Sequence, residues 1–379
     1  MPRFYYVPAF YDPNTAATNR SLSFIKGFSE LGVQTKVVFF RPNYNYDHIK
    51  DSFPNIDFIY YWDSCYLNKS FLKYISLFFY YFKFLLTLKK GDTVLSYGNA
   101  DLWSFILRFK KGIRLFVEYT EHPEVTGIGG RFLTPSLESF YYLLNKVDGL
   151  FVITTALRDF FISKGVQPHR ISIINITVDP HRFENLSKDS NVEPYIGYCG
   201  VVSNNKDGVN LLIQSFSKVV KFFPNIKLYI AGKILYDEDR VVITKMIQSL
   251  SLENNILFKG VLSALEMPQF LCNAKVLVLN RPNNLQARNG FATKLGEYLL
   301  SEVPVVVTDV GDFHLFLKDG DSALLSNPDF PNQFAEKILW VLSNECKAKI
   351  IGKKGADIAK HHFSYLAVVS NIIQKMNLK

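Results

Sequence analysis

The chain has 379 residues, about two or three times the length of a typical domain, so two domains are the first expectation. Hydrophobic residues make up 48% and charged residues 20%, which are ordinary globular proportions and exclude a wholly disordered protein. The net charge of +9 favours an anionic partner: a nucleic acid, an anionic membrane surface or a phosphate-bearing substrate.

The cysteines and the N-terminal residues indicate the compartment. The four cysteines are far apart, form no Cys-x-x-Cys pair and lie in mostly apolar contexts. This pattern is typical of a reducing compartment and argues against a disulfide framework or a structural zinc site. The first residues, MPRFYYVPAFYDPN, contain no long apolar run of a secretory signal. We therefore expect a cytoplasmic location, with peripheral binding to the inner face of the cytoplasmic membrane left open.

Short apolar runs alternate with helical patterns in the first part of the chain. Buried strands are predicted at 4–7, 35–40, 57–61, 93–97, 113–117 and 150–154. Helices are predicted between them, at 15–31, 69–88, 100–109, 136–147 and 155–164. Continuous apolar strands that alternate with helices predict a parallel sheet covered on both faces.

Residues 71–88, FLKYISLFFYYFKFLLTL, hold the densest part of an aromatic fraction of 15%. At 100° per residue the polar side chains form one stripe: Lys73, Ser76, Tyr80, Lys83 and Thr87. Two lysines in mid-span would each cost about 2.5–3.5 kcal/mol at a bilayer centre, so no spanning helix is expected. Two interpretations remain open: a mostly buried helix with one solvated edge, or an interfacial helix that touches lipid headgroups.

The alternation restarts after a polar, aperiodic stretch at 179–193, which is typical of a linker. Further strands are predicted at 195–200, 227–231, 256–259, 275–280 and 304–308, and helices at 208–222, 238–250, 264–272, 293–301 and 331–343. We predict domains over 1–185 and 186–360, with a C-terminal helix at 361–379 that packs back on the first domain. Doubly wound sheets bind ligands beyond the carboxyl ends of their strands, so a cleft between the domains is the expected site.

The stretch 280–309, NRPNNLQARNGFATKLGEYLLSEVPVVVTD, places a polar loop between a strand and a helix start. Gly290 allows backbone to approach a ligand, and the free N–H groups of the helix start suit a phosphate. Lys294 adds a cation, and Glu297 lies on the same helix face, where a carboxylate suits ribose hydroxyls. A solvated ion pair between these two, worth about 0.2–0.5 kcal/mol, is the alternative.

The run GFATKLGEYLLSEVPVVVTDVGD resembles the nucleotide-sugar segment of retaining glycosyltransferases of family 4. Further runs resemble this family in the same order: IINITVDPHRF, YIGYCGVVSNNKDGVNLLIQSF, KLYIAG and NNILFKGVLSALEMPQFLCNAKVLVL. The resemblance covers about residues 150–345 well and the N-terminal third more loosely. It implies an α/β protein of the GT-B fold, with two doubly wound Rossmann-like domains that face a central cleft.

By position, the resemblance also implies a donor site. Glu297 would hold the ribose hydroxyls, Lys206 would neutralise the diphosphate, and Val261 would border the base. Two positions depart from the family pattern: Asn289 replaces a glutamate that contacts the donor sugar, and Val201 replaces an arginine. Arg281 or Lys294 would compensate for the missing cation. The full implied set is Lys206, Val261, Arg281, Asn289, Gly290, Phe291, Ala292, Thr293, Lys294 and Glu297, with Phe291 and Ala292 offering backbone N–H groups.

The first domain supplies the other candidates. Glu121 and His122 follow the strand predicted at 113–117, near the place where the family has a histidine that contacts the transferred sugar. The register leaves both as candidate catalytic residues, with a structural hydrogen-bonding role as the alternative for either. The loop at 11–19 resembles the family's first loop, which closes over donor and acceptor, and Thr15 and Asn19 lie at its helix start.

No metal is expected. Asp237-Glu238-Asp239 and Asp319-Gly320-Asp321 have Asp-x-Asp spacing, but acidic residues are common at helix starts and in turns. No His or Cys cluster has zinc spacing. No nucleic-acid motif is present, so no nucleic-acid partner is expected. We expect no cofactor, the substrate being a UDP- or GDP-linked sugar.

The resemblance thus implies a retaining, metal-independent, hexosyltransferase-type enzyme. It would move a sugar from a nucleotide diphosphate sugar to a saccharide or lipid-linked saccharide, in bacterial surface polysaccharide or glycolipid synthesis. The alternatives are a nucleotide-sugar epimerase on the same fold, a non-catalytic nucleotide-sugar-binding protein, and a membrane-surface protein held through residues 71–88.

Overall fold

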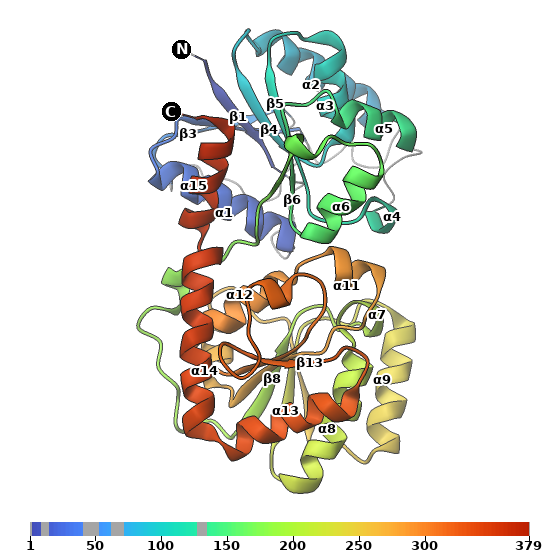
Figure 1. Ribbon diagram of the computed structural model, residues 1–379, viewed down its shortest axis with the longest axis vertical. Helices are drawn as coiled ribbons and strands as arrows, with labels where there is room; N and C mark the ends of the chain where they lie inside the picture. Colours follow the sequence, from blue (N-terminus) through green and yellow to red (C-terminus); the bar gives the residue numbers. More distant parts are fainter. Residues whose placement is uncertain (1, 9–14, 41–52, 62–71, 127–134, 379) are drawn as a thin grey trace. The chain divides into compact units, whose positions relative to one another are not determined.

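The computed structural model describes residues 2–8, 15–40, 53–61, 72–126 and 135–378. The chain divides into two compact units, of which the first combines Met1–Thr177 with Tyr365–Lys379 and the second is Val178–Ser364. Each unit consists of a sheet with helices around it (Figure 1).

The described residues of the first unit form a parallel sheet in the order β3-β2-β1-β4-β5-β6-β7. Its strands are β1 (Phe4–Val7), β2 (Thr35–Phe39), β3 (Ile56–Tyr60), β4 (Thr93–Tyr97), β5 (Arg114–Tyr119), β6 (Gly149–Val152) and β7 (Ile171–Ile173). Its helices are α1 (Ala16–Glu30), α2 (Leu72–Thr87), α3 (Ala100–Phe109), α4 (Pro123–Thr126), α5 (Leu137–Leu144), α6 (Thr155–Ser163) and α15 (Tyr365–Met376). The elements predicted for this unit are confirmed. The short β7 and α4 were not predicted.

Helices cover both faces of this sheet. Alternate strand residues point to opposite faces, so Tyr5 packs under α2, α3, α5 and α6, whereas Tyr6 packs toward α1 and α15. A Cβ at Gly27 of α1 would lie 2.6 Å from Val369 Cγ2, so the close contact of α1 with α15 depends on glycine. The last helix of the chain is therefore part of the first unit's core.

Helix α2 buries one side and exposes the other. Leu77, Tyr81 and Phe84 belong to the core. The large apolar side chains of the outer side are between 46% and 69% exposed: Ile75, Phe78, Phe79, Phe82 and Leu86. The interpretation of α2 as a mostly buried helix with one solvated edge is wrong, because five large apolar side chains are exposed in addition. Among the described residues, no helix is both long and apolar enough to cross a membrane.

The described residues of the second unit form a parallel sheet in the order β10-β9-β8-β11-β12-β13, in which the winding direction reverses between β8 and β11. The strands are β8 (Tyr195–Cys199), β9 (Lys227–Ala231), β10 (Ile256–Gly260), β11 (Val276–Leu279), β12 (Val305–Thr308) and β13 (Leu324–Ser326). The helices are α7 (Asn204–Asp207), α8 (Val209–Phe222), α9 (Asp237–Ser249), α10 (Glu266–Asn273), α11 (Leu285–Asn289), α12 (Thr293–Leu300), α13 (Pro331–Ser343) and α14 (Glu345–Ile358), with a 3-10 turn η2 (Pro180–Phe183). The short β13, α7 and α11 were not predicted.

Close backbone contacts hold the loops at the carboxyl ends of these strands. Gly208, with φ +61°, lies so near the carbonyl oxygen of Asn280 that a Cβ would collide with it. Gly232, with φ +143°, meets the carbonyl oxygen of Gly200 in the same way. Since only glycine combines this conformation with this lack of space, both loops are fixed in place. Both loops adjoin the site described next, because Gly208 follows Asp207 and Gly232 contacts Gly200.

Candidate functional site

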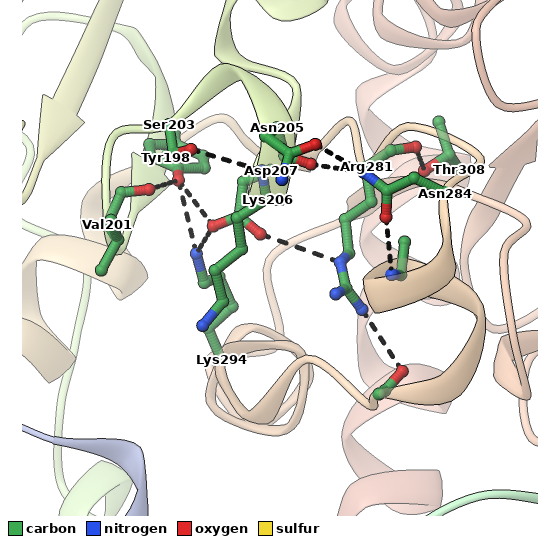
Figure 2. A network of polar contacts seen from close by, with 12 residues as sticks. Tyr198, Val201, Ser203, Asn205, Lys206, Asp207, Arg281, Asn284, Lys294 and Thr308 are labelled. Atoms are coloured by element: carbon green, nitrogen blue, oxygen red, sulfur yellow. Dashed lines mark hydrogen bonds and ion pairs between the residues drawn. The ribbon is translucent and has the colours of Figure 1, made fainter. Parts of the chain in front are cut away.

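Polar side chains gather where the second sheet reverses its winding. Gly200 and Val201 follow β8, while Asn280 and Arg281 follow the neighbouring β11. Helix α7 brings Asp207 to the same place, and α12 brings Lys294 (Figure 2). Doubly wound sheets bind their ligands at this point, because the loops after the two central strands diverge there.

Asp207 is the centre of a buried charge cluster. Its Oδ2 forms an ion pair with Lys294 Nζ and accepts a hydrogen bond from the Tyr198 hydroxyl at 2.8 Å. Its Oδ1 lies 3.8 Å from Arg281 Nε. Burial acts to raise the pKa of Asp207, but the Lys294 and Arg281 cations outweigh burial and hold this pKa below its usual value. One carboxylate between two cations leaves the cluster with one net positive charge.

Lys294 is held firmly at the end of β8. Its ammonium group lies 4.8 Å from the centre of the Tyr198 ring, within cation–π range. A Cβ at Gly200, where φ is +135°, would collide with Lys294 Nζ. The role of this cation in a donor site stays a prediction. Its main partner in the structure is Asp207, which no spacing rule indicated.

Arg281 is a deeply buried cation. Its side chain is 3% exposed, and Nη1 donates to the carbonyl oxygen of Gly290 at 3.4 Å. Figure 2 shows its guanidinium group between Asp207 and that carbonyl. Arg281 thus holds the loop before α12 in place, and its buried positive charge adds to the charge of the Asp207 cluster.

Lys206 differs from these two cations. In the described part of the chain its amino group has no ion pair or hydrogen bond, and Figure 2 shows it extending past the Asp207 cluster. It lines a cavity of about 410 Å³, within the usual range of small-molecule sites. The other lining residues are Val201, Ser203, Asn205, Leu235, Tyr236, Glu238, Asp239 and Gln286.

The start of α12 offers backbone donors. No side chain caps the helix at Ala292, so the N–H groups of its first turn have no cap partner, and Thr293 is half-buried there. The ring of Phe291 anchors this start because it packs 5.0 Å from Phe313 and 5.5 Å from Phe363. Gly290 has φ −102°, an extended conformation open to any residue, and its predicted close approach to a ligand stays a prediction.

Asn289, at the position of the family's first glutamate, is turned to its own helix. Its side chain is 8% exposed, and Nδ2 donates to the Leu285 carbonyl oxygen at 3.0 Å. The side-chain carbonyl is still a neutral acceptor, where the family has a carboxylate.

Glu297 has a partner that the sequence did not reveal. Arg182, in η2, forms an ion pair with Glu297 Oε1 through Nη1, and its Nη2 donates to the Ala264 carbonyl oxygen at 2.8 Å. Ala264 belongs to the loop after β10, where Val261 is 64% exposed. The stretch IINITVDPHRF contained Arg182, but its partner lies 115 residues away, so no spacing signal could have found the pair.

The two Asp-x-Asp patterns lie at a helix start and in a turn, and Glu238 and Asp239 of the first pattern line the cavity beside Lys206. Asp237–Asp239 form the first turn of α9, and Asp319 and Asp321 pair with Lys337 and Lys354. Within the described ranges, no group of three His, Cys, Asp or Glu side chains is arranged to hold a metal ion.

In the first unit, Glu121 and His122 follow β5. His122 is 4% exposed, and burial lowers its pKa, so the imidazole is neutral. Its Nδ1 accepts a hydrogen bond from the Glu124 backbone at 3.3 Å, which leaves the proton on Nε2 as a donor. Glu121 is half-buried.

Thr15 and Asn19 lie at the start of α1. Thr15 is the N-cap of that helix, accepting a hydrogen bond from the Thr18 backbone at 3.3 Å, and Asn19 is exposed. Residues 11–14 of the predicted closing loop lie outside the described residues.

Residues 181–357 match the family described as Glycosyl transferases group 1. The chain is 24% identical over 82% of its length to a poly(ribitol-phosphate) alpha-N-acetylglucosaminyltransferase of Staphylococcus aureus. It is 27% identical over 54% of its length to the capsular polysaccharide biosynthesis glycosyltransferase CapM of the same species. These matches span 60% and 50% of the two relatives. The solved structure of Anabaena Alr3699/HepE in complex with UDP superimposes with a TM-score of 0.73 at 17% identity, covering 99% of each chain.

Proposed function

We propose that the chain, which has the GT-B fold and matches the glycosyl transferases group 1 family over residues 181–357, transfers a sugar from a nucleotide diphosphate sugar to an acceptor hydroxyl. The observation that carries this proposal is the cationic site at the reversal point of the second sheet. There the Asp207 cluster holds Lys294 from α12, and the neighbouring Lys206 lines a cavity whose other charged lining residues are Glu238 and Asp239.

The proposed role of the site is to stabilise the departing nucleoside diphosphate. As the bond to the sugar breaks, negative charge grows on the diphosphate. Lys206 and the net charge of the Asp207 cluster supply two positive charges, and the N–H groups of Phe291 and Ala292 add donors near the start of α12. Fixed donors of this kind cost no reorganisation during the reaction, and they supply charge without a metal ion.

We further propose that the sugar keeps its anomeric configuration. The resemblance implies a reaction on one face of the sugar, in which the leaving phosphate takes the proton of the acceptor hydroxyl. No protein nucleophile is then needed. The first unit would serve the acceptor, and His122, which the resemblance places near the transferred sugar, is the first candidate for a contact with a sugar hydroxyl. Glu121 remains the second candidate for this contact.

The names of the similar proteins guide the choice of substrates. One relative acts on poly(ribitol-phosphate) and another belongs to capsular polysaccharide synthesis, which supports a surface polysaccharide or glycolipid as the product. The solved relative was crystallised with UDP. UDP-linked sugars are therefore the first donors to test, with GDP-linked sugars second.

Replacing Lys206 with Ala is expected to lower kcat by roughly 100- to 1,000-fold, as for the loss of one charge-stabilising donor. The measurement is release of nucleoside diphosphate from a panel of nucleotide sugars with saccharide acceptors. Lys245→Ala, on an exposed position of α9, is the matched control. Wild-type activity should survive chelation of divalent metals.

Three outcomes would contradict the proposal. Wild-type protein that binds no nucleoside diphosphate or nucleotide sugar would favour a different role. Deuterium incorporation from solvent into the recovered nucleotide sugar would indicate an epimerase. Lys206→Ala with wild-type turnover would show that the donor site lies elsewhere.

We also propose that α2 binds an anionic membrane surface. Five apolar side chains of its outer side recur at helical spacing: Ile75, Phe78, Phe79, Phe82 and Leu86. Phe105 of α3 lies 5.2 Å from Phe78 and 4.7 Å from Phe109, which is itself 59% exposed and extends the apolar surface. Among the described residues of α2, of α3 and of the segments that follow each of them, the exposed charged side chains are all cations: Lys83, Lys89, Lys90, Arg108 and Lys111. Apolar contact combined with positive charge suits anionic headgroups, where a lipid-linked acceptor would be found.

Flotation with vesicles of zwitterionic lipid, with and without added anionic lipid, tests this partner. The double variant Phe78→Ser/Phe79→Ser should lower the bound fraction at least about tenfold, because each ring loses on the order of 1.5–3 kcal/mol of apolar burial. Val241→Ser/Val242→Ser, exposed on α9, is the control. Equal flotation of the α2 variant and the wild type would contradict the proposal.

A further inference from the structure

Arg182 connects two parts of the second unit that the sequence separates widely. Its guanidinium fork forms an ion pair with Glu297 of α12 through one nitrogen and donates to the Ala264 carbonyl oxygen through the other. The side chains of Arg182 and Glu297 are 31% and 24% exposed, so the pair is open to a ligand. One rigid group therefore sets the distance between the α12 carboxylate and the loop after β10.

The backbone that carries Arg182 is anchored. Asp179 caps η2 by accepting a hydrogen bond from the His181 N–H at 3.1 Å, and Pro180 fixes the first position of the turn. One residue earlier, the Val178 N–H donates to the Phe363 carbonyl oxygen at 2.8 Å. Phe363 packs against Phe291, which holds the start of α12. The segment 178–183 is thus tied to the same helix that its arginine reaches.

The loop on the other side of Arg182 is ordered in the same manner. Ser263 and Glu266 exchange hydrogen bonds, with each backbone N–H donating to the other side chain at 2.9 and 3.2 Å. Between them, Ala264 turns its carbonyl oxygen to Arg182. The loop is otherwise open to solvent, since Val261 is 64% and Leu265 92% exposed.

We propose that Arg182 is a positioning residue for the nucleoside half of the donor. This inference rests on the proposed function, in which Glu297 accepts the ribose hydroxyls and the loop at Val261 borders the base. Arg182 occupies Oε1 of Glu297 and orients the carboxylate so that Oε2 faces the ribose, while it holds the base-bordering loop at a fixed distance. A planar fork with several donors suits this double contact better than a lysine.

The test compares nucleotides that contain and lack the ribose hydroxyls. Affinities of UDP, 2′-deoxy-UDP and 3′-deoxy-UDP are measured by calorimetry for the full-length wild type, Arg182→Ala, Arg182→Lys, Glu297→Gln and the double variant Arg182→Ala/Glu297→Gln. Arg240→Ala, an exposed arginine 3.8 Å from Asp237, is the control. If the wild type binds GDP in preference to UDP, the guanosine series replaces the uridine series.

Arg182→Ala should weaken UDP binding by roughly tenfold, about one charge-assisted hydrogen bond. For the deoxynucleotide that lacks the hydroxyl bound by Glu297, Arg182→Ala should change the affinity by no more than about twofold. The double variant Arg182→Ala/Glu297→Gln should bind UDP as weakly as Glu297→Gln alone does. Arg182→Lys should recover part of the affinity, since it restores the ion pair without the fork. If Arg182 had a purely structural role, Arg182→Ala would lower the affinity for all the nucleotides equally.

The outcomes separate this inference from the function on which it rests. The inference is wrong if Glu297→Gln weakens UDP binding but Arg182→Ala does not. Unchanged affinity would mean that Arg182 has no part in nucleotide binding, and higher affinity would mean that Arg182 competes with the nucleotide for Glu297. If Arg182→Ala does not fold, the same comparison made with Arg182→Lys decides. If Glu297→Gln binds UDP and the deoxynucleotides as the wild type does, the proposed donor site itself is wrong.

Discussion

Replacing Asp207 with Asn is expected to lower the free energy of unfolding of the second unit by about 3–5 kcal/mol, because it leaves two buried cations without their carboxylate. Asp207 is 1% exposed, Arg281 3% and Lys294 15%, so water cannot take the place of the lost partner. The Tyr198 hydroxyl would also lose a charged acceptor. Urea denaturation followed by tryptophan fluorescence and circular dichroism measures the change.

The control is Asp237→Asn, an almost fully exposed carboxylate near Arg240, which should change the unfolding free energy by less than about 0.5 kcal/mol. Adding Lys294→Met to Asp207→Asn should restore part of the stability, because it removes one unpaired cation. If Asp207→Asn lowers the free energy of unfolding by less than about 1 kcal/mol, the stabilising role given to Asp207 is wrong.

The same cluster has a pH signature. The folded-state pKa of Asp207 lies below its usual value of 3.8, so its contribution to stability is fully present above that value. It is lost as the pH falls through the lower folded-state pKa, and this part of the acid sensitivity should be missing in Asp207→Asn.

Replacing Glu297 with Ala is expected to weaken nucleoside diphosphate binding by roughly 10- to 150-fold, which corresponds to about 1.5–3 kcal/mol for hydrogen bonds to a charged group. The physical reason is the loss of the carboxylate proposed to accept the ribose hydroxyls. Transfer activity should fall at least as far, since the same contact orients the donor for reaction. Calorimetry with UDP and GDP, and nucleotide release assays, provide the measurements.

Glu336→Gln is the matched control, because Glu336 is an exposed glutamate on α13 of the same unit. It should bind and turn over as the wild type does. Glu297→Ala also leaves Arg182 unpaired, but Arg182 is 31% exposed and remains solvated, so the fold should survive. Wild-type affinity in a folded Glu297→Ala protein would remove Glu297 from the donor site.

Local patterns sufficed for most of the architecture. Strands such as Lys227–Ala231 and helices such as Pro331–Ser343 were predicted at their observed bounds, because a buried parallel strand and an amphipathic helix each leave a period in the sequence. The short helices α7 and α11 escaped prediction because a helix of four or five residues is too short to show a helical period, and the three-residue strand β13 was also missed.

The candidate site was predicted only in part. Lys206, Lys294 and Glu297 were named from one helix start and one family resemblance. In the second unit Lys294 pairs with Asp207, and Lys206 lines a cavity. Asp207 itself and Arg182 were missed. Both act through partners 87 to 115 residues away, and no local period records such a distance.

The sequence by itself determined most of the elements, their parallel arrangement and the resemblance to a family, because these follow from hydrophobic periods and from the order of short motifs. Only the tertiary structure decided which charges meet. The strand order brings the carboxyl ends of β8 and β11 together, so Asp207 joins Lys294 and Arg281. It also decided which apolar side chains stay outside: α3 and the sheet cover one side of α2 and leave Phe79 exposed. Burial and ion pairing depend on neighbours that are distant in sequence, and folding alone supplies those neighbours.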